Sequence, residues 1–188
     1  MRDRVRYWAR MVRHAPDQLL HRYRRHQVLQ RLKEQRPIER VVFVCHGNIN
    51  RSAYAAAAFA RALEAERCDG IIVRSAGFVG PGRAASELAQ RVAMRRGIDL
   101  SQHQSRLIDA NELRTADLIV VMSTSQRRSV YRIARQSDPF VIVLGDLDSE
   151  PIARRTVQDP YGHPEEVFVQ VFDRIDRCIA QLVRGIRG

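Results

Sequence analysis

The sequence has little of what marks a secreted, membrane-spanning or metal-binding protein. Its three cysteines are an odd number at wide spacing, which favours reduced thiols over a disulfide framework. No apolar run approaches the length of about 18 residues that a membrane span needs, and the N-terminus shows no apolar stretch typical of secretory signals. The histidines include no pair at metal-ligand spacing. We therefore expect a cytoplasmic protein that uses no metal and no other cofactor.

Lysine is also nearly missing, because Lys33 is the only lysine among 32 basic residues. In a chain this rich in arginine, no single arginine is a strong signal. The basic residues are unevenly spread: residues 1–40 hold 12 of them against 4 acidic residues, whereas residues 41–188 hold 20 against 17. This boundary predicts a basic helical N-terminal extension over residues 1–38 and one larger domain over residues 39–188.

The extension is expected to form two helices. Residues 3–15 place apolar side chains on one face and arginines on the opposite face, as in an amphipathic basic helix that Pro16 would end. Asp17 would cap a second helix that runs to about Glu34. The apolar residues of this second helix lie on two sides, with Leu19, Leu20 and Tyr23 on one and Val28 and Leu32 on the other.

Three roles are open for this extension. It can pack on its own domain or on a second copy of the chain, lie on an anionic membrane surface, or contact nucleic acid or an acidic partner. Nucleic acid is the least favoured partner, since only charge supports it, without zinc-ligand spacing or a recognition helix. A membrane contact would place the protein at the inner membrane surface.

After Pro37 the pattern changes to short β-branched runs separated by helical stretches, which is typical of βαβ units. We therefore expect an α/β fold, a doubly wound four-stranded parallel sheet flanked by helices, to which the N-terminal helical arm is added. Its ligand should bind beyond the carboxyl ends of the strands. The predicted strands cover residues 41–45, 71–75, 118–122 and 141–144, and the predicted helices cover residues 52–66, 85–96, 111–115, 125–135 and 164–183.

The loop between the first strand and its helix carries the strongest chemical signal. A strand-to-helix loop can curl until its successive N–H groups converge at the helix N-terminus, and such a nest binds an oxyanion such as phosphate. The same donors would stabilise a thiolate at Cys45, a nucleophile facing the bound phosphorus, while Arg51 offers a planar fork for two phosphate oxygens. The other interpretation of Cys45 is a small buried residue at a strand end. The loop residues are His46, Gly47, Asn48, Ile49, Asn50 and Ser52.

Thiolate attack on a phosphoester also needs a proton donor for the leaving oxygen, and later a base for the hydrolytic water. Asp159, in the turn-rich stretch before the last predicted helix, can supply both. Alternatively, Asp159 and Pro160 form an ordinary turn. The residues alone give these two interpretations equal weight.

These motifs, taken in order over about residues 39–184, resemble those of the low-molecular-weight protein tyrosine phosphatases. The resemblance implies a metal-free, cysteine-dependent phosphatase domain over residues 39–188, which hydrolyses phosphotyrosine in proteins through a cysteinyl-phosphate intermediate. It implies that Cys45 is the nucleophile, Arg51 the phosphate clamp, and Asp159 first the general acid and then the base. The similar segments are residues 45–52, 75–77, 97–101 with 103, 105–106, 116–119 and 159–161.

The resemblance also implies a set of supporting residues. Asn48, Ser52, Ser75 and His103 would hold the loop, and the Ser52 hydroxyl would ease the departure of the Cys45 sulfur. The other interpretation of His103 is a core histidine with its hydrogen bonds satisfied, and both interpretations can hold together. The mouth would be lined by Tyr161 and His46, because residues 78–82 lack the aromatic tip that often grips the substrate ring.

At one position of the loop the sequence departs from that family. Asn50 stands where many members have a second cysteine, so no protective disulfide can form beside Cys45. Two other functions stay open. One is an arsenate reductase of the same fold, which needs further thiols that Cys68 and Cys178 are poorly placed to supply. The other is a catalytically silent module that binds phosphoproteins.

Overall fold

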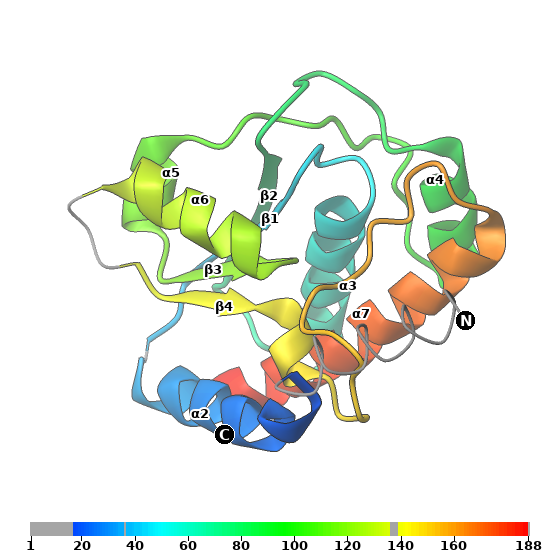
Figure 1. The fold of residues 1–188 in the computed structure, drawn as a ribbon. Coiled ribbons are helices and arrows are strands. Elements are labelled where there is room, and N and C mark those ends of the chain that lie inside the picture. Colours follow the sequence, from blue (N-terminus) through cyan, green and yellow to red (C-terminus); the bar gives the residue numbers. More distant parts are fainter. Residues whose placement is uncertain (1–16, 36, 136–138, 188) are drawn as a thin grey trace, which may run out of the picture.

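The computed structural model describes residues 17–35, 37–135 and 139–187 of the 188-residue chain. The helix expected over residues 3–15, and the proline that would end it, lie outside the described residues. Within the described residues, helices flank both faces of a central parallel sheet, and an additional helix precedes the first strand (Figure 1).

The sheet has four parallel strands in the order β2-β1-β3-β4. Strands β1, β3 and β4 are buried along nearly their whole length because helices cover both of their faces. Their runs of valine and isoleucine suit strands that are buried on both sides. The predicted sheet is thus confirmed, with bounds β1 (Arg40–Cys45), β2 (Ile72–Gly77), β3 (Leu118–Val121) and β4 (Val141–Val143).

Alternate residues of β1 face two separate cores. Val41, Phe43 and Cys45 pack on the side of α3 and α7, while Val42 and Val44 pack on the side of α5 and α6. Cys45 therefore ends its strand on the face that α3 covers. The helices of the first side are α3 (Arg51–Ala65), α4 (Glu87–Met94) and α7 (Glu165–Arg187), and those of the second are α5 (Ala110–Thr115) and α6 (Thr124–Ala134).

A short 3-10 helix, η1 (Leu144–Leu147), follows β4 directly and was not predicted from the sequence. All four of its residues are buried. Leu144 prolongs the apolar run of β4, so the sequence pattern cannot distinguish the first residue of this turn from the last residue of a strand. η1 begins the stretch of chain that leads to Asp159.

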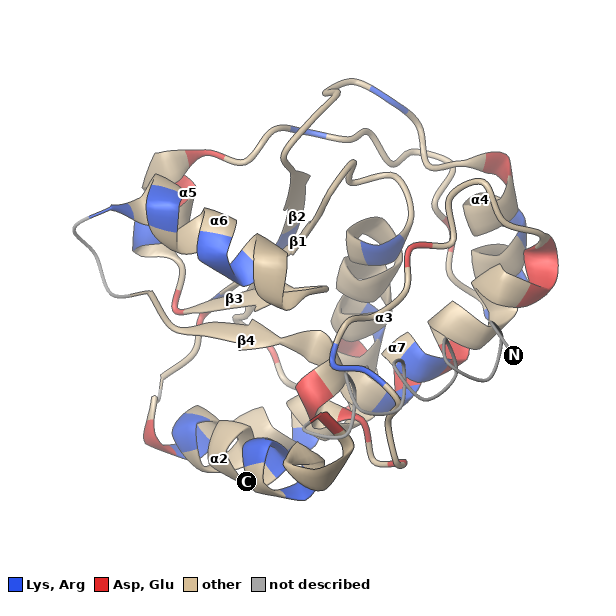
Figure 2. Cartoon of the chain, in the orientation of Figure 1, with Lys and Arg blue, Asp and Glu red and all other residues tan. Residues whose placement is uncertain are grey.

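Helix α2 (His21–Glu34) packs against α7 and η1, so the described part of the arm lies on its own domain (Figure 1). Leu32 is fully buried, and Val28 and Leu29 pack beside it. The two helices approach closely at Gly185 of α7, where a Cβ atom would lie 2.9 Å from Cδ1 of Leu32. The other apolar side, Leu19, Leu20 and Tyr23, stays exposed. Figure 2 shows basic bands along α2.

The helix cap predicted at Asp17 is wrong. α2 begins at His21, after Leu20, and no side chain caps it. The Asp17 carboxylate instead accepts hydrogen bonds from the Arg24 guanidinium and from the backbone N–H of Arg155. Asp17 therefore accepts from an arginine side chain of α2 and from a distant loop, and not from the backbone N–H groups of the first turn of α2.

Candidate active site

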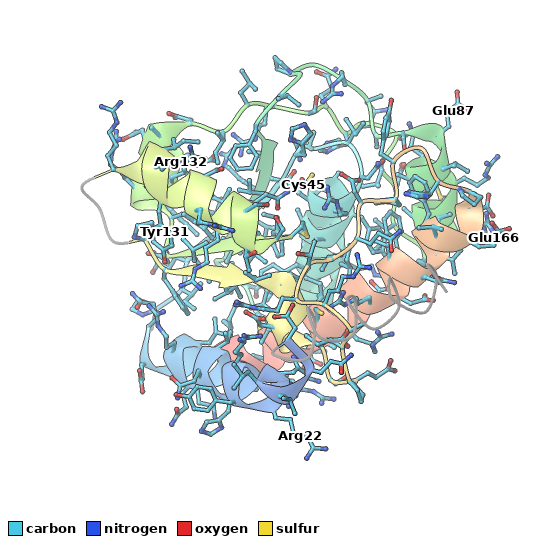
Figure 3. The ribbon with its side chains drawn as sticks, viewed as in Figure 1. Arg22, Cys45, Glu87, Tyr131, Arg132 and Glu166 are labelled. Atoms are coloured by element: carbon cyan, nitrogen blue, oxygen red, sulfur yellow. The ribbon has the colours of Figure 1, made fainter. Side chains whose placement is uncertain are left out.

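The predicted phosphate-binding loop lies at the carboxyl end of β1, near the centre of the molecule, where Figure 3 labels Cys45. Asn48 adopts a left-handed backbone conformation with φ of 52°, which lets the chain curl between β1 and α3. The loop forms one wall of a pocket of about 200 Å³. The pocket is lined by Cys45, His46, Gly47, Ile49, Asn50, Arg51, Val79, Arg83, Asp159 and Tyr161.

The carbonyl groups of the loop are all held by donors outside the cup. The His46 oxygen accepts from the backbone N–H of Phe78 at 2.8 Å, and the Gly47 oxygen accepts from Nη2 of Arg83 at 2.9 Å. The Asn48 oxygen lies 2.6 Å from Nε2 of His103. Because a trans peptide directs its N–H opposite to its carbonyl, each of these bonds turns the next N–H toward the cup.

The next two carbonyl groups of the loop, those of Ile49 and Asn50, are also bonded to donors outside the cup. The oxygen of Ile49 accepts from the N–H of Ser86 at 3.1 Å, and the oxygen of Asn50 accepts from the N–H of Tyr54 at 2.9 Å within α3. Among the described residues, the N–H groups of Gly47, Ile49 and Asn50 have no protein acceptor. Together with the positive end of the α3 dipole, they form a nest suited to an oxyanion.

The sulfur of Cys45 receives two hydrogen bonds at the bottom of this cup. The N–H of Asn48 lies 3.2 Å from Sγ, and the hydroxyl of Ser52 lies 3.0 Å from it. Ser52 itself accepts from Nδ2 of Asn48 at 2.9 Å, so its own proton is directed to the sulfur. Both donors stabilise a thiolate more than a thiol.

Asn48 ties the loop to its surroundings through every polar atom of its side chain. Nδ2 donates to the hydroxyls of Ser52 and Ser75, each at 2.9 Å, and Oδ1 accepts from the N–H of Arg106 at 3.0 Å. The backbone oxygen of the same residue is held by His103. The residues expected to hold the loop, Asn48, Ser52, Ser75 and His103, are therefore brought together by the structure.

Arg51 and Asp159 meet beside the cup. Arg51 is buried, and its guanidinium pairs with Oδ2 of Asp159 and donates to the Val157 oxygen at 3.1 Å. The Nε–H of Arg51 is buried without a partner among the described residues, which leaves donor capacity for a further acceptor. Asp159 also accepts from the N–H of Tyr161 at 3.3 Å, so it forms the ordinary turn as well as facing the pocket.

The mouth of the pocket contains one residue that sequence reasoning missed. Arg83 donates to the oxygens of Gly80, Val79 and Gly47 at 2.8 to 3.0 Å and has no carboxylate partner within the described chain. Tyr161 and His46, expected at the mouth, are both exposed there. One arginine in so arginine-rich a chain gave no signal that could have singled out Arg83.

Asn50 occupies a supporting place in the wall. Its side-chain oxygen accepts from the hydroxyl of Ser86 at 2.6 Å, and Ser86 in turn caps α4. The other two cysteines do not line the pocket. Cys178 is buried in α7, where desolvation raises the pKa of its thiol, and Cys68 follows α3. No group of three or more metal-ligating side chains gathers in the part of the chain that the structure describes.

The first strand of the parallel sheet ends in a cysteine, which lies beneath free amides and beside a buried arginine. This is the arrangement expected of a cysteine-dependent phosphatase. The chain belongs to the low molecular weight phosphotyrosine protein phosphatase family, whose model matches residues 40–187. Residues 1–39 precede the matched range.

Curated relatives agree with this assignment. The low molecular weight protein-tyrosine-phosphatase Ptp of Acinetobacter johnsonii is 32% identical over 151 residues, which are 78% of this chain and 96% of that protein. A protein-arginine-phosphatase of Geobacillus stearothermophilus is 28% identical over 149 residues, which are 79% of this chain and 96% of that protein. The family thus includes proteins named for two different phosphorylated side chains.

Solved structures support the same fold. The low molecular weight protein tyrosine phosphatase from T. tengcongensis aligns with a TM-score of 0.69 at 31% identity, over 78% of this chain and 98% of that one. The tyrosine phosphatase AmsI of Erwinia amylovora aligns with a TM-score of 0.72 at 25% identity, over 80% of this chain and 95% of that one. The α/β architecture predicted from the sequence is therefore shared with known phosphatases.

Proposed function

We propose that this protein hydrolyses phosphotyrosine in proteins through a phosphocysteine intermediate. The thiolate of Cys45 attacks phosphorus, the S–P bond forms as the P–O bond to the tyrosine breaks, and Asp159 gives its proton to the departing phenolate oxygen. Water then attacks phosphorus, Asp159 takes its proton, and the sulfur leaves as a thiolate that Ser52 stabilises. The loop amides and Arg51 stabilise the equatorial phosphate oxygens in both steps.

The observation that carries this proposal is the outward anchoring of every loop carbonyl. It leaves several N–H donors around one sulfur, with Arg51 and Asp159 beside it. A binding module needs no ionisable acid at this place. An arsenate reductase needs a second thiol near Cys45, whereas Cys68 and Cys178 do not line the pocket.

The walls of the pocket favour an aromatic phosphoester over phosphoarginine. Ile49, Val79 and Tyr161 offer apolar surface to a ring. A guanidinium would instead meet the unneutralised cation of Arg83, and Asp159, which carries the proton in this step, offers it no negative charge. Desolvating a second guanidinium here without a counter-ion is unfavourable.

We expect a kcat/KM at least about 100-fold higher for a phosphotyrosine peptide than for a phosphoarginine peptide of the same sequence. Released phosphate, measured with and without a chelator, checks this, and the chelator should change neither rate. Faster hydrolysis of phosphoarginine would contradict the substrate class while leaving the phosphatase chemistry intact. No hydrolysis of either peptide would favour the binding module.

For the arm, we propose contact with an anionic membrane surface through its outward side. Leu19, Leu20 and Tyr23 are exposed there, and Arg22 points away from the body (Figure 3). Apolar residues among cations are the pattern that anionic lipid attracts. None of the described helices has the length and hydropathy needed to cross a membrane.

Co-sedimentation with vesicles that contain phosphatidylglycerol should fall at least about threefold in the double variant Leu19→Asp, Leu20→Asp. The matched control is Met94→Asp, which changes an exposed apolar residue of α4 and should sediment like the wild type. A doubled mass in light scattering that the same double variant abolishes, without any vesicle binding, would replace this proposal by contact between two copies.

A further inference from the structure

The position of Asp159 depends on the irregular stretch of chain, residues 148–158, that connects it to η1. Near its end, Val157 is fully buried, its N–H donates to the oxygen of Met122 at 2.9 Å, and its oxygen accepts from Arg51. The stretch contains no helix or strand of its own. Side chains from other elements must therefore hold its backbone in place.

Helix α7 holds one side of this stretch. Arg174 donates to the backbone oxygens of Thr156 at 2.9 Å and Arg154 at 2.7 Å, and to the buried carboxylate of Asp148 at 3.0 Å. Arg177 makes further contacts to Asp148 at 3.0 and 3.3 Å. All of these contacts are made between residues of the range 40–187, which the family model matches.

The arm holds the other side. His21, itself buried, lies with Nε2 2.9 Å from the backbone oxygen of Asp148, and because that oxygen only accepts, Nε2 carries the proton. The Asp17 carboxylate accepts from the N–H of Arg155 at 3.3 Å. Figure 1 shows the start of the described arm, in dark blue, beside the yellow stretch that follows η1. The arm thus contacts this stretch at two points, Asp148 and Arg155. The chain then continues to Asp159, the proposed acid.

The Arg155 side chain extends this attachment into the core. Its guanidinium makes a two-pronged contact with the buried carboxylate of Asp146, at 2.7 and 2.6 Å. A single residue therefore connects Asp17 of the arm to η1 through its backbone and its side chain. The buried carboxylates of Asp146 and Asp148 thus pair with Arg155 of the stretch and with arginines of α7.

We propose that Asp17 and His21 are positioning residues for the catalytic acid, so that the N-terminal extension is a working part of the active site. They hold residues 148–158 through contacts separate from those of Arg174 and so keep Asp159 in reach of the leaving oxygen. This inference rests on the proposed role of Asp159. It gives the arm a function in catalysis that is independent of any membrane or second copy.

The test uses the full-length chain and two leaving groups. In the double variant Asp17→Ala, His21→Leu, kcat/KM for phenyl phosphate should fall about tenfold, because a displaced acid protonates a basic phenolate poorly. For 4-nitrophenyl phosphate, whose leaving group needs little protonation, the loss should stay below about twofold. Binding of inorganic phosphate should be kept, because the loop carbonyls are held by Arg83, His103 and Ser86, which lie outside the stretch.

Three controls separate positioning from a merely structural role. The conservative pair Asp17→Asn, His21→Gln keeps an acceptor and a donor and should restore most of the phenyl phosphate activity, which also keeps the test valid if the first pair melts below the assay temperature. Tyr23→Ala, on the exposed side of the arm, should behave like the wild type. On an Asp159→Ala background, the disruptive pair should cause no further loss.

Equal losses with both leaving groups, a further loss on the Asp159→Ala background, or full activity of a folded disruptive pair would each overturn the inference. A wild-type protein that hydrolyses neither aryl phosphate would instead overturn the proposed function itself. The two failures are therefore distinguishable.

Discussion

Replacing Cys45 by serine should lower kcat for aryl phosphates at least about 10⁴-fold. The N–H of Asn48 and the hydroxyl of Ser52 donate to Sγ, and a serine hydroxyl in its place is a far weaker nucleophile than a thiolate. The cup itself does not depend on the sulfur, since its carbonyls are held by Arg83, His103 and Ser86. Initial rates of 4-nitrophenyl phosphate hydrolysis measure the loss.

Phosphate binding gives this prediction its control. A thiolate repels a phosphate dianion, so Cys45→Ser should bind inorganic phosphate at least as tightly as the wild type in calorimetry. Cys45→Ala, which lacks any nucleophile, should bind phosphate in the same way. Activity of the serine variant above about one hundredth of the wild-type rate would contradict a covalent role for Cys45. Lost phosphate binding would mean that the sulfur is needed to build the cup.

Features that depend on local pattern could be predicted from the sequence. Each strand is a short apolar run, and the loop of the active site lies between one such run and an alanine-rich helix. The spacing of Cys45 and Arg51 therefore placed both at one pocket. The family resemblance added the prediction that Asn48 and His103 hold the loop. In the structure Asn48 bonds to Ser52, and His103 bonds to the backbone oxygen of Asn48.

Features that depend on partners far along the chain could not be predicted. Arg83, Ser86 and the oxygen of Val157 reach the loop across 36 to 106 positions, and they do so largely through backbone oxygens and N–H groups, which every residue type carries. The arm illustrates the same limit. Its two apolar sides were equivalent in the sequence, and only the tertiary fold buries Leu32 and exposes Leu19.

Replacing Asp159 by alanine should lower kcat/KM for phenyl phosphate roughly 10² to 10⁴-fold, and by much less for 4-nitrophenyl phosphate. Phenolate is a strong base and needs a proton as the P–O bond breaks, whereas 4-nitrophenolate leaves without one. The change also frees the guanidinium of Arg51 from its carboxylate partner, so binding of inorganic phosphate should be kept or strengthened. Steady-state rates with the two esters, together with phosphate inhibition, measure these effects.

Asp159→Asn distinguishes two roles of Asp159, that of proton donor and that of turn residue. Asparagine forms the same kind of turn with Tyr161 as aspartate does, so a residue needed only for the turn would tolerate it. An amide cannot give up a proton to phenolate, so we expect the asparagine variant to lose as much activity on phenyl phosphate as the alanine variant does. Near wild-type activity in Asp159→Asn would reduce Asp159 to a turn residue, and the proton donor would then have to be sought elsewhere along the pocket wall.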